Sequence, residues 1–498
     1  MVQTHIISNA HIICSLWVMF LLTPLLNIKI DQSSAQYVKI QLRDQDCLQL
    51  GEVKVYGYPA TEGFPIESLD KLTLGNDAAR CWQTKGSRIM LTSDTHWWED
   101  SHTTLVEGSP SAGVLAVLPL AKKKTAVDET FGYPDFAVEV ALLDRKLEFT
   151  GEKETGDHEK IGGHLIVLHT PMVKQHLEGA MFVNFGQQTR LGRYPLHFHM
   201  SECVHGSTVA KNVIWKSNQR CFVVHGTHNL TLSENVAYDT RGHCYMLEDG
   251  GGKYFSSYVG DDISVARMVY AHILCPFYPH SLIILEWDNV FYRNLGAYTR
   301  PPVAWNNPAG LIRSGETDHF PSTFWITNPA NDFIDNQAAG SRSTGIWFEL
   351  KLRAPSSTLA INQGSNPKTN PQGKFEGNVA HSNNFRAGIT TYQSGYRAPP
   401  GTTWTNIKSY KNNGSGLFQH GTNNIIMKGG LLADNGEAAR NFHHEWAVYD
   451  GVEIIGRSAH AQSLIDQGRL SDGCGKAGGI SLQPNEGMGV SISFHHLK

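Results

Sequence analysis

The stretch that decides the fold runs from residue 212 to residue 247 and reads NVIWKSNQRCFVVHGTHNLTLSENVAYDTRGHCYML. It contains the same two-part phrase twice, at a distance of 23 residues (235 − 212). Each copy begins with an asparagine, Asn212 or Asn235, followed by small or β-branched residues. Nine residues later each copy ends in a short apolar segment, which starts at Cys221 or Cys244. A phrase that repeats at this period indicates a solenoid of stacked coils.

The phrase returns three more times farther along the chain, at residues 336–348, 378–391 and 406–418. The offset between its two parts stays at nine or ten residues, while the period grows where coils carry insertions. The segments are short and β-rich, without helical periodicity or the Leu-x-x-Leu-x-Leu pattern. We therefore predict an all-β, single-stranded parallel β-helix. We interpret the repeating asparagines as a structural ladder that satisfies turn amides; they are Asn212, Asn235, Asn336, Asn378 and Asn406.

Composition excludes other classes of protein. Of 498 residues, 41% are hydrophobic and only 18% are charged, which supports a large core and argues against disorder. The formal net charge is −4, and 122–124 is a lone short run of lysines. A nucleic-acid partner requires a basic stripe, so we expect none.

The first 35 residues predict export. Residues 12–26 form an apolar run that is short for a membrane span but typical of a signal-peptide core, and small residues precede a cleavage position near Ala35. We expect a signal peptide or a membrane anchor over 1–35 and a secreted or cell-surface protein. The sequons at Asn229 and Asn413 predict glycosylation. The seven cysteines beyond Cys14 are too sparse for a disulfide scaffold but allow one or two bridges.

Several motifs carry a resemblance to a known family. Residues 136–145 (FAVEVALLDR) are similar to the end of a G8 domain, and 192–200 (GRYPLHFHM), 224–228 (VHGTH) and 235–250 follow in order. This succession resembles the family of the cell-migration-inducing and hyaluronan-binding protein and transmembrane protein 2, and also the fibrocystin-like proteins. The resemblance implies a G8 region, a right-handed, pectin-lyase-like parallel β-helix, and an acidic polysaccharide such as hyaluronan as partner. The G8 part is shorter than in the family, and 251–283 is an insertion.

The predicted organisation combines the repeat with this resemblance. Residues 36–79, a β-rich segment, resemble the closing strands of a galactose-binding-like module. The predicted segments are 1–35 (signal peptide or anchor), 36–79, 80–158 (G8-like), 159–460 (parallel β-helix) and 461–498 (C-terminal tail or cap), with a long loop at 352–372.

Aligning the phrases predicts a column of titratable side chains. Equivalent residues of neighbouring coils stack about 4.8 Å apart. The dipeptides ending in His197, His225 and Glu248 then place these three side chains above one another. Two imidazoles and a carboxylate can bind a divalent cation, calcium or another, or serve in acid–base catalysis. We predict Glu248 as the general acid with a raised pKa, because the column is expected to be partly buried.

The residues around the column complete the predicted site. Asp249 joins Glu248, His225 and His197 as a catalytic candidate, and Arg193, a clamp for a uronate carboxylate, joins His199, His228 and His243 as substrate-binding candidates. Hydrolysis needs a second carboxylate, for which Asp239 and Glu286 are alternatives to Asp249. β-Elimination, with a histidine or tyrosine base, and carbohydrate binding without cleavage stay open as alternatives to hydrolysis.

Overall fold

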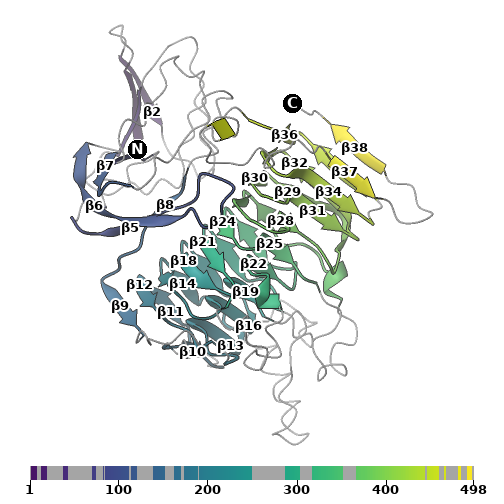
Figure 1. Cartoon of the computed structure of the whole chain (residues 1–498), viewed down its shortest axis with the longest axis horizontal. Helices are drawn as coiled ribbons and strands as arrows, with labels where there is room; N and C mark the ends of the chain where they lie inside the picture. The colour runs from purple at the N-terminus through teal and green to yellow at the C-terminus, as the bar shows by residue number, and fades with distance from the viewer. Residues whose placement is uncertain are drawn as a thin grey trace, which may run out of the picture.

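Three ten-stranded parallel sheets, here named A, B and C, run side by side along one axis in the computed structural model (Figure 1). Neighbours within each sheet are three strands apart in chain order, because every coil adds one strand to each sheet. The predicted parallel β-helix is confirmed. The structure describes residues 2–7, 13–18, 37–42, 70–74, 82, 85–111, 114–120, 138–151, 162–169, 173–188, 190–248, 286–302, 317–350, 366–443, 446–458, 465–466, 480–483 and 491–495.

The strands of sheets A and B alternate along the chain. Sheet A contains β10 (Leu165–Val167), β13 (Leu196–Cys203), β16 (Phe222–His228), β19 (Tyr245–Leu247), β22 (Ser322–Ile326), β25 (Thr344–Phe348), β28 (Ala387–Thr390), β31 (Ser415–His420), β34 (Glu437–Phe442) and β37 (Ile480–Gln483). Sheet B contains β11 (His176–Glu178), β14 (Thr208–Ala210), β17 (Thr231–Ser233), β20 (Val290–Tyr292), β23 (Asp332–Ile334), β26 (Phe375–Glu376), β29 (Arg397–Thr405), β32 (Asn423–Lys428), β35 (Trp446–Asp450) and β38 (Ser491–His495).

Sheet C completes each coil and shows where the solenoid begins. It contains β9 (Leu147–Thr150), β12 (Ala180–Val183), β15 (Val213–Trp215), β18 (Val236–Arg241), β21 (Leu295–Arg300), β24 (Gln337–Ser341), β27 (Val379–His381), β30 (Lys408–Tyr410), β33 (Leu431–Ala433) and β36 (Glu453–Ile455). Because β9 pairs with β12 and β38 pairs with β35, the solenoid extends beyond the predicted range of 159–460 at both ends. Two short 3-10 helices, η3 (Thr317–His319) and η4 (Pro367–Thr369), lie between strands. Residues 352–365 of the predicted loop lie outside the described residues.

The predicted asparagine ladder is present, but it includes Asn294 and does not include Asn406. Each side-chain amide donates to the Oδ1 atom of the next asparagine, at 3.2 Å from Asn212 to Asn235 and 3.0 Å from Asn235 to Asn294. The chain of bonds continues through Asn336 to Asn378. Asn294 was not predicted, because the insertion before it hides the repeat. The predicted membership of Asn406 is wrong. Val379 pairs with Lys408, so Ile407 occupies the ladder position after Asn378.

Aromatic rings stack along the core between the sheets. The rings of Phe222, Tyr245 and Phe324, on successive strands of sheet A, lie 4.9 and 4.7 Å apart and nearly parallel. Phe291 and Phe333 on sheet B stack at 4.6 Å. Because side chains alternate between the faces of a strand, the next residue of each sheet-A strand points away from this core. That outward row carries the candidate site.

An N-terminal sheet of five antiparallel strands packs on sheet C (Figure 1). A buried contact joins the two parts: Nε2 of His381 lies 3.0 Å from a carboxylate oxygen of Glu139. Nε2 of His96 also bonds the carbonyl of Asp434 at 2.6 Å. Four strands of this sheet lie in the predicted G8-like segment, 80–158, and its first strand lies in the preceding predicted segment, 36–79. It contains β4 (Lys71–Thr73), β5 (Arg88–Leu91), β6 (His102–Ser111), β7 (Val114–Val117) and β8 (Val140–Leu142).

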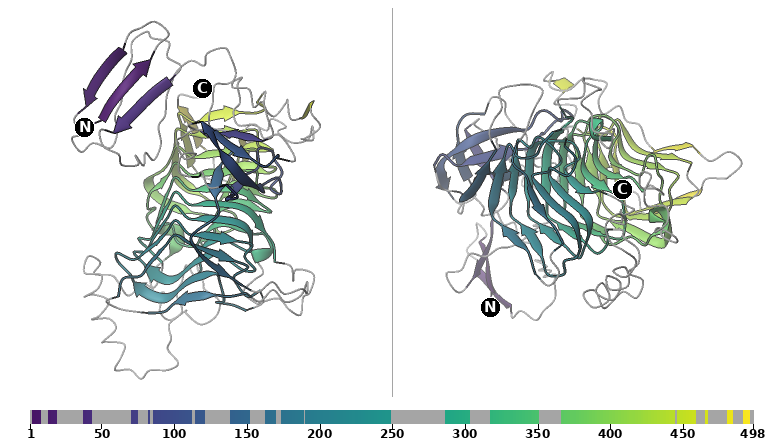
Figure 2. Two further views of the ribbon diagram at one scale, coloured as in Figure 1. Left: turned by 90° about the vertical axis from the view of Figure 1, so that its left-hand side faces the viewer. Right: turned by 90° about the horizontal axis from the view of Figure 1, so that it is seen from below.

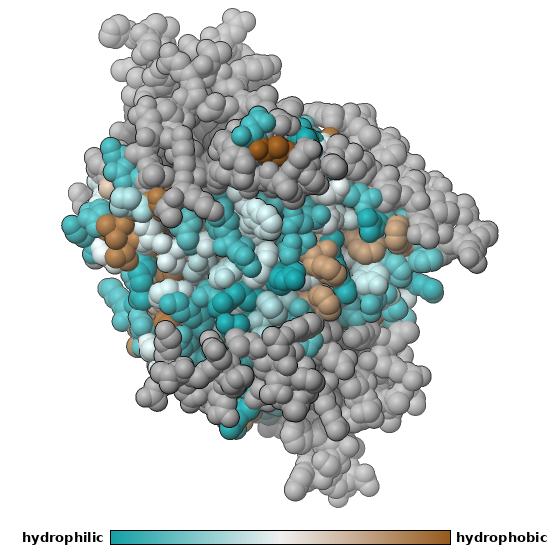
Figure 3. Space-filling view, viewed as in Figure 1, coloured by the Kyte–Doolittle hydropathy of each residue, from teal (hydrophilic) through white to brown (hydrophobic). Residues whose placement is uncertain are grey.

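The first residues form a separate three-stranded antiparallel sheet of β1 (Val2–Ile7), β2 (Ile13–Val18) and β3 (Tyr37–Leu42), seen beside the solenoid in Figure 2. The predicted cleavage position, Ala35, lies outside the described residues. Among the described residues no helix is long and apolar enough to cross a membrane. The face of the molecule in Figure 3 is mainly hydrophilic where it is described, with small separate hydrophobic patches.

Candidate active site

The predicted column lies on sheet A, but in a different register. His199, not His197, pairs with His225, and His197 pairs with Val223. The prediction stacked His197 on His225 across a step of 28 residues, whereas Leu196 pairs with Phe222 and the step is 26 residues (222 − 196). The register shift in β13 falls after His199 and leaves this pairing unchanged. The predicted pairing of His197 with His225 is therefore wrong, although His197 remains close to the cluster.

Glu248 is the centre of the cluster. Its carboxylate follows β19 directly and accepts hydrogen bonds at Oε1 from the Tyr194 hydroxyl at 2.5 Å and from Arg220 Nη1 at 2.7 Å. Its second oxygen, Oε2, lies 3.6 Å from His197 Nε2 and 3.5 Å from His225 Nδ1. The three residues of the predicted column thus lie together around one carboxylate.

The pKa of Glu248 is shifted in the direction opposite to the prediction. Burial by itself would raise the pKa of this carboxyl group. The neighbouring His225, Arg220 and His197 and the Tyr194 hydrogen bond outweigh burial and lower the pKa to about 2. The expected raised pKa is therefore wrong, and Glu248 is a carboxylate at neutral pH.

His197 is fully buried and has a defined tautomer. Its Nδ1 lies 2.9 Å from the carbonyl oxygen of Gly192, which can only accept, so Nδ1 carries the proton and Nε2 carries a lone pair. Burial lowers the pKa of His197 to about 4, which Glu248 opposes only in part. At neutral pH this imidazole is uncharged.

Arg220 and Tyr194 are the residues that the sequence analysis missed. Arg220 is 3% exposed and bridges two carboxylates, since its Nη1 binds Glu248 and its Nη2 lies 3.1 Å from Asp318. Burial would lower the pKa of Arg220, but Asp318, Tyr194 and Glu248 raise it above its ordinary value. The signal for both was their position just before an apolar strand, where the chain turns into sheet A.

Arg193 lies apart from this cluster. It is exposed, and its Nη1 is 3.1 Å from Nε2 of His164. The arginine that contacts Glu248 is Arg220. The role of Arg193 as a substrate clamp stays a prediction.

The other two predicted histidines pack against aromatic rings. His228, at the end of β16, stacks on Trp287 at 4.8 Å. His243 is buried, with Nδ1 3.0 Å from the Ser322 hydroxyl and its ring 3.9 Å from that of Trp325. His243 also shares Asp318 with Arg220, since its Nε2 lies 3.5 Å from that carboxylate. Their surroundings indicate that both support the fold around the cluster.

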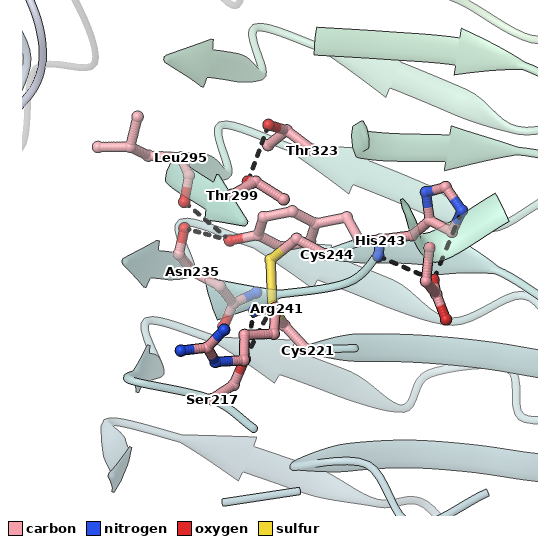
Figure 4. The surroundings of a disulfide bond; sticks show 11 residues. Ser217, Cys221, Asn235, Arg241, His243, Cys244, Leu295, Thr299 and Thr323 are labelled. Atoms are coloured by element: carbon pink, nitrogen blue, oxygen red, sulfur yellow. Dashed lines mark hydrogen bonds and ion pairs between the residues drawn. A yellow bond between two sulfur atoms is a disulfide. The ribbon is translucent and has the colours of Figure 1, made fainter. Parts of the chain in front are cut away.

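A disulfide joins the strands that carry the cluster. Cys221 and Cys244 begin neighbouring turns of sheet A, with Cα atoms 4.6 Å apart, and are bonded to each other (Figure 4). This is one of the one or two bridges that the cysteine count allowed. It ties the segment after Arg220 to the segment before Glu248.

The carboxylates proposed as alternative partners of Glu248, and the two sequons, lie at different places in the fold. Asp249 lies outside the described residues. Asp239 is on sheet C and forms an ion pair with Arg300, while Glu286 is buried and accepts a bond from the Gly226 amide at 2.9 Å. The asparagines of the sequons are half-buried: Asn413 donates to Asn384 at 2.7 Å, and Asn229 lies 3.7 Å from the Cys203 sulfur. Their glycosylation stays a prediction.

The three imidazoles of the cluster also come together. Nδ1 of His199 is 3.0 Å from Nδ1 of His225, and the rings of His197 and His199 are 4.8 Å apart. One ligand atom from each of the three histidines lies within 4.8 Å of the others. This is the arrangement in which a metal ion could be held.

Fold and site define a parallel β-helix protein with a buried cluster of histidines around one glutamate. Residues 160–257 and 285–389 match the family model described as CEMIP β-helix, which spans the cluster. This stretch of the chain is thus similar to the family that the motifs in the sequence predicted.

The relatives have two kinds of name. The chain is 27% identical over 361 residues to the human cell surface hyaluronidase CEMIP2 and 28% identical over 367 residues to the cell surface hyaluronidase of Danio rerio. It is 31% identical over 276 residues to a G8 domain-containing protein of Dictyostelium discoideum. These alignments cover 66%, 67% and 53% of this chain but only 23%, 24% and 16% of the relatives. The chain thus spans about a quarter or less of each relative's length.

Proposed function

We propose that this protein depolymerises an extracellular acidic polysaccharide of the hyaluronan type, at the cluster of His197, His199, His225 and Glu248. The observation that carries the proposal is a cluster of three imidazoles, two of which lie 3.5–3.6 Å from one carboxylate, in the stretch that matches the family. The names of two relatives, both cell surface hyaluronidases, support the substrate class. The same names support a location at the cell surface. Secretion by cleavage of a signal peptide, or an N-terminal membrane anchor, stays a prediction from the first 35 residues.

The cluster offers groups that can move protons and fix charge. An imidazole within hydrogen-bond reach of a glycosidic oxygen or of a sugar C–H can serve as acid or base. Glu248 is held in place by Tyr194 and Arg220 and would act as a fixed negative charge beside the reacting sugar. Hydrolysis would need a second carboxyl group, whereas elimination would need a base and neutralisation of the uronate. We favour hydrolysis because the relatives are named hyaluronidases.

Size analysis of labelled polysaccharides tests this function. The full chain would be incubated with labelled hyaluronan, chondroitin, pectate and neutral dextran, and the products sized by gel filtration. We expect shortening of hyaluronan or of another acidic chain, and intact dextran. Absorbance near 232 nm from unsaturated ends would assign elimination in place of hydrolysis. Unchanged chain lengths across the panel would refute the depolymerase.

The second candidate function is carbohydrate binding without cleavage. It is favoured by the bonding of Glu248, because a carboxylate that accepts two hydrogen bonds and pairs with a buried arginine is not a proton donor. Retention of labelled hyaluronan by the immobilised protein, with no change in its length, would support this function.

A further inference from the structure

We propose that His197, His199, His225 and Glu248 bind one divalent transition-metal ion, of which zinc is the type. The proposal concerns the same cluster as the proposed function, but it does not need cleavage to hold, because a metal site can be measured directly. It rests on the geometry of four ligand atoms, on the tautomer of His197 and on the hydrogen bonds of Glu248.

The spacing of the ligand atoms fits a small tetrahedral ion. Zinc binds histidine nitrogen at about 2.0–2.1 Å, so two ligands of a tetrahedral site lie about 3.4 Å apart. Nδ1 of His225 lies 3.0 Å from Nδ1 of His199 and 3.5 Å from Oε2 of Glu248. Nε2 of His197 lies 3.6 Å from the same Oε2. These three separations are within a few tenths of an ångström of the required spacing, while the three imidazole ligand atoms lie within 4.8 Å of one another and would have to move closer around the ion.

His197 presents a lone pair to the centre of the cluster. Its Nδ1 donates to the Gly192 carbonyl, so in the neutral imidazole the lone pair is on Nε2. Among the described residues this buried Nε2 atom has no hydrogen-bond partner. A backbone carbonyl that orients the far nitrogen of an imidazole is a common supporting contact for metal-binding histidines. A lone pair that faces a carboxylate oxygen at 3.6 Å is repelled by it unless a proton or a metal cation lies between them, and a metal ion is the cation that can also bind the other two imidazoles.

The hydrogen bonds of Glu248 leave one oxygen directed at the histidines. Tyr194 and Arg220 both donate to Oε1, so Oε2 is the atom turned toward His197 and His225. Carboxylate ligands of metals are oriented by such bonds to their other oxygen. Tyr194 and Arg220 would therefore be positioning residues, and Glu248 a ligand.

The ligand atoms select the class of metal. Three imidazole nitrogens and one carboxylate oxygen suit zinc and its first-row neighbours. Calcium takes six to eight oxygen ligands, and this cluster offers a single carboxylate with three nitrogens. Of the two kinds of divalent cation that the sequence left open, the transition metal is the one we propose.

Titration with cobalt(II) and zinc(II) tests the site. The full chain is stripped with a chelator and dialysed, and cobalt(II) is added while the visible spectrum is recorded. We expect one equivalent to bind with the intense absorption of tetrahedral cobalt, and zinc(II) to displace it. The variants His199→Gln and His225→Gln should weaken binding at least 100-fold. The control His176→Gln changes an exposed histidine on sheet B and should bind as the wild type does.

The outcomes separate the metal site from the depolymerase. Binding of less than a tenth of an equivalent by the folded wild type would refute the site, even if the protein cleaves polysaccharide. Cobalt binding by the two cluster variants that equals that of the wild type would also refute it. So would a wild-type protein that binds calcium but not cobalt and loses calcium binding in the same variants. One equivalent bound by a protein that cleaves nothing would support the metal and refute only the depolymerase. The wild-type cobalt spectrum decides the question even if a variant fails to fold.

A second, independent observation concerns the outer face of sheet A farther along the solenoid. The pairing of strands places Trp325, Trp347, Thr390, Phe418 and Arg440 in one column, which continues the row that contains His197. These positions lie on β22, β25, β28, β31 and β34, along the right-hand side of Figure 1. The column becomes more exposed toward its C-terminal end, since Trp325 and Trp347 are buried and Phe418 and Arg440 are half-buried.

Guanidinium groups lie over aromatic rings on this face. Arg386 stands 4.6 Å from the Trp347 ring and 4.8 Å from the Tyr392 ring, and Arg440 stands 5.6 Å from the Phe418 ring. Tyr392 and Phe418 stack at 5.1 Å. Such contacts hold each guanidinium in place while its edges can bind carboxylates, and the rings offer apolar faces to sugars. We infer that this surface binds the acidic chain beyond the cleavage point, an inference that rests on the proposed function for its substrate class.

Binding measurements in a non-cleaving background test this surface. In the Glu248→Gln variant, the affinity for a labelled hyaluronan oligomer is compared with and without Arg386→Ala and Arg440→Ala. Each substitution should weaken binding about tenfold, the factor that corresponds to about 1.4 kcal/mol. The control Arg397→Ala removes an exposed arginine on sheet B and should change binding less than twofold. Equal affinities for the double variant and its background would refute the surface without touching the depolymerase or the metal.

Discussion

Two polar columns run through the same solenoid and differ in how their hydrogen bonds are arranged. In the asparagine ladder each amide donates to the next and accepts from the one before, as from Asn235 to Asn294 and from Asn294 to Asn336. In the cluster on sheet A, lone pairs of His197 and an oxygen of Glu248 face one another at 3.6 Å. The ladder is complete without a ligand, whereas the cluster gathers groups that attract a cation or a proton.

This difference separates a structural column from a functional one better than burial does. Asn294 and His197 are both fully buried, and both lie in rows that repeat from coil to coil. The chemistry of the repeated group decides: an amide carries a donor and an acceptor, so identical neighbours satisfy each other. A row of imidazoles and a carboxylate cannot do so at a single protonation state. Four predictions test this comparison.

The largest effect is expected from Glu248→Gln. Loss of the fixed negative charge should reduce depolymerisation by about 10² to 10³, the range typical for the loss of one preorganised electrostatic group in an active site. The fold should be retained, because glutamine can still bond Tyr194 and Arg220. Initial rates on labelled hyaluronan, with circular dichroism as the check on folding, measure this. The control is Glu234→Gln, an exposed glutamate on the turn after β17. If the folded Glu248→Gln variant cleaves at the wild-type rate, the cluster has only a structural role, as the asparagine ladder does.

The second prediction breaks the ladder in its middle. Asn294→Ala removes the acceptor of two bonds from Asn235 and the donor of one bond to Asn336. Leaving buried groups without partners should lower the free energy of unfolding by about 2–3 kcal/mol. Cleavage by the folded fraction should be unchanged. The control Asn423→Ala, at a half-buried position of β32, should cost less than about 1 kcal/mol. A urea midpoint equal to the wild type would show that the ladder contributes nothing.

The fold could be predicted because the repeat is local in the chain. The ladder positions Asn212 and Asn235 and the strands that follow them are separated by one coil, so sequence spacing translates directly into stacking. The prediction failed where spacing was ambiguous. Asn294 follows an insertion, and Asn406 stands one residue before the position that pairs with Asn378. A register error of one residue is invisible in composition, but it turns the side chain to the other face.

The site could be predicted only in part, for the same reason. His225 and Glu248 stand at equivalent positions of two neighbouring coils, and their side chains do lie together. His199 stands beside His225 in place of His197, because the coil between them is two residues shorter than the step that the prediction assumed. Arg220 and Asp318 meet across 98 residues, a contact that no repeat predicts. The pKa of Glu248 was misjudged because the prediction gave burial more weight than the charge of His225 and did not include Arg220.

The third prediction uses a titratable contact in place of the neutral ladder. Glu139 bonds His381 where the five-stranded sheet meets sheet C. Burial would raise the pKa of Glu139, but His381 and Thr92 lower it below 4.5. Because the pKa of Glu139 is lower in the folded protein than in the unfolded chain, its ionised form stabilises the fold at pH values above the unfolded pKa. This stabilisation is lost as the pH falls through the pKa of the folded protein. Glu139→Gln should therefore cost about 1–3 kcal/mol at pH 6 and less at pH 3.5. Thermal unfolding at both pH values measures this, and a cost that does not depend on pH would contradict it.

The smallest effect is expected from Arg193→Ala. Arg193 was predicted as the clamp for a uronate, yet it is exposed and its side chain contacts His164. An exposed guanidinium contributes up to about 1 kcal/mol to an ion pair, so the affinity for a hyaluronan oligomer should fall at most about fivefold. Fluorescence polarisation in the Glu248→Gln background at low and high salt measures this, and the small loss should shrink further as salt screens the charge. A loss of 100-fold that persists in high salt would mean that the substrate buries Arg193, and that the binding site extends from the cluster toward β10.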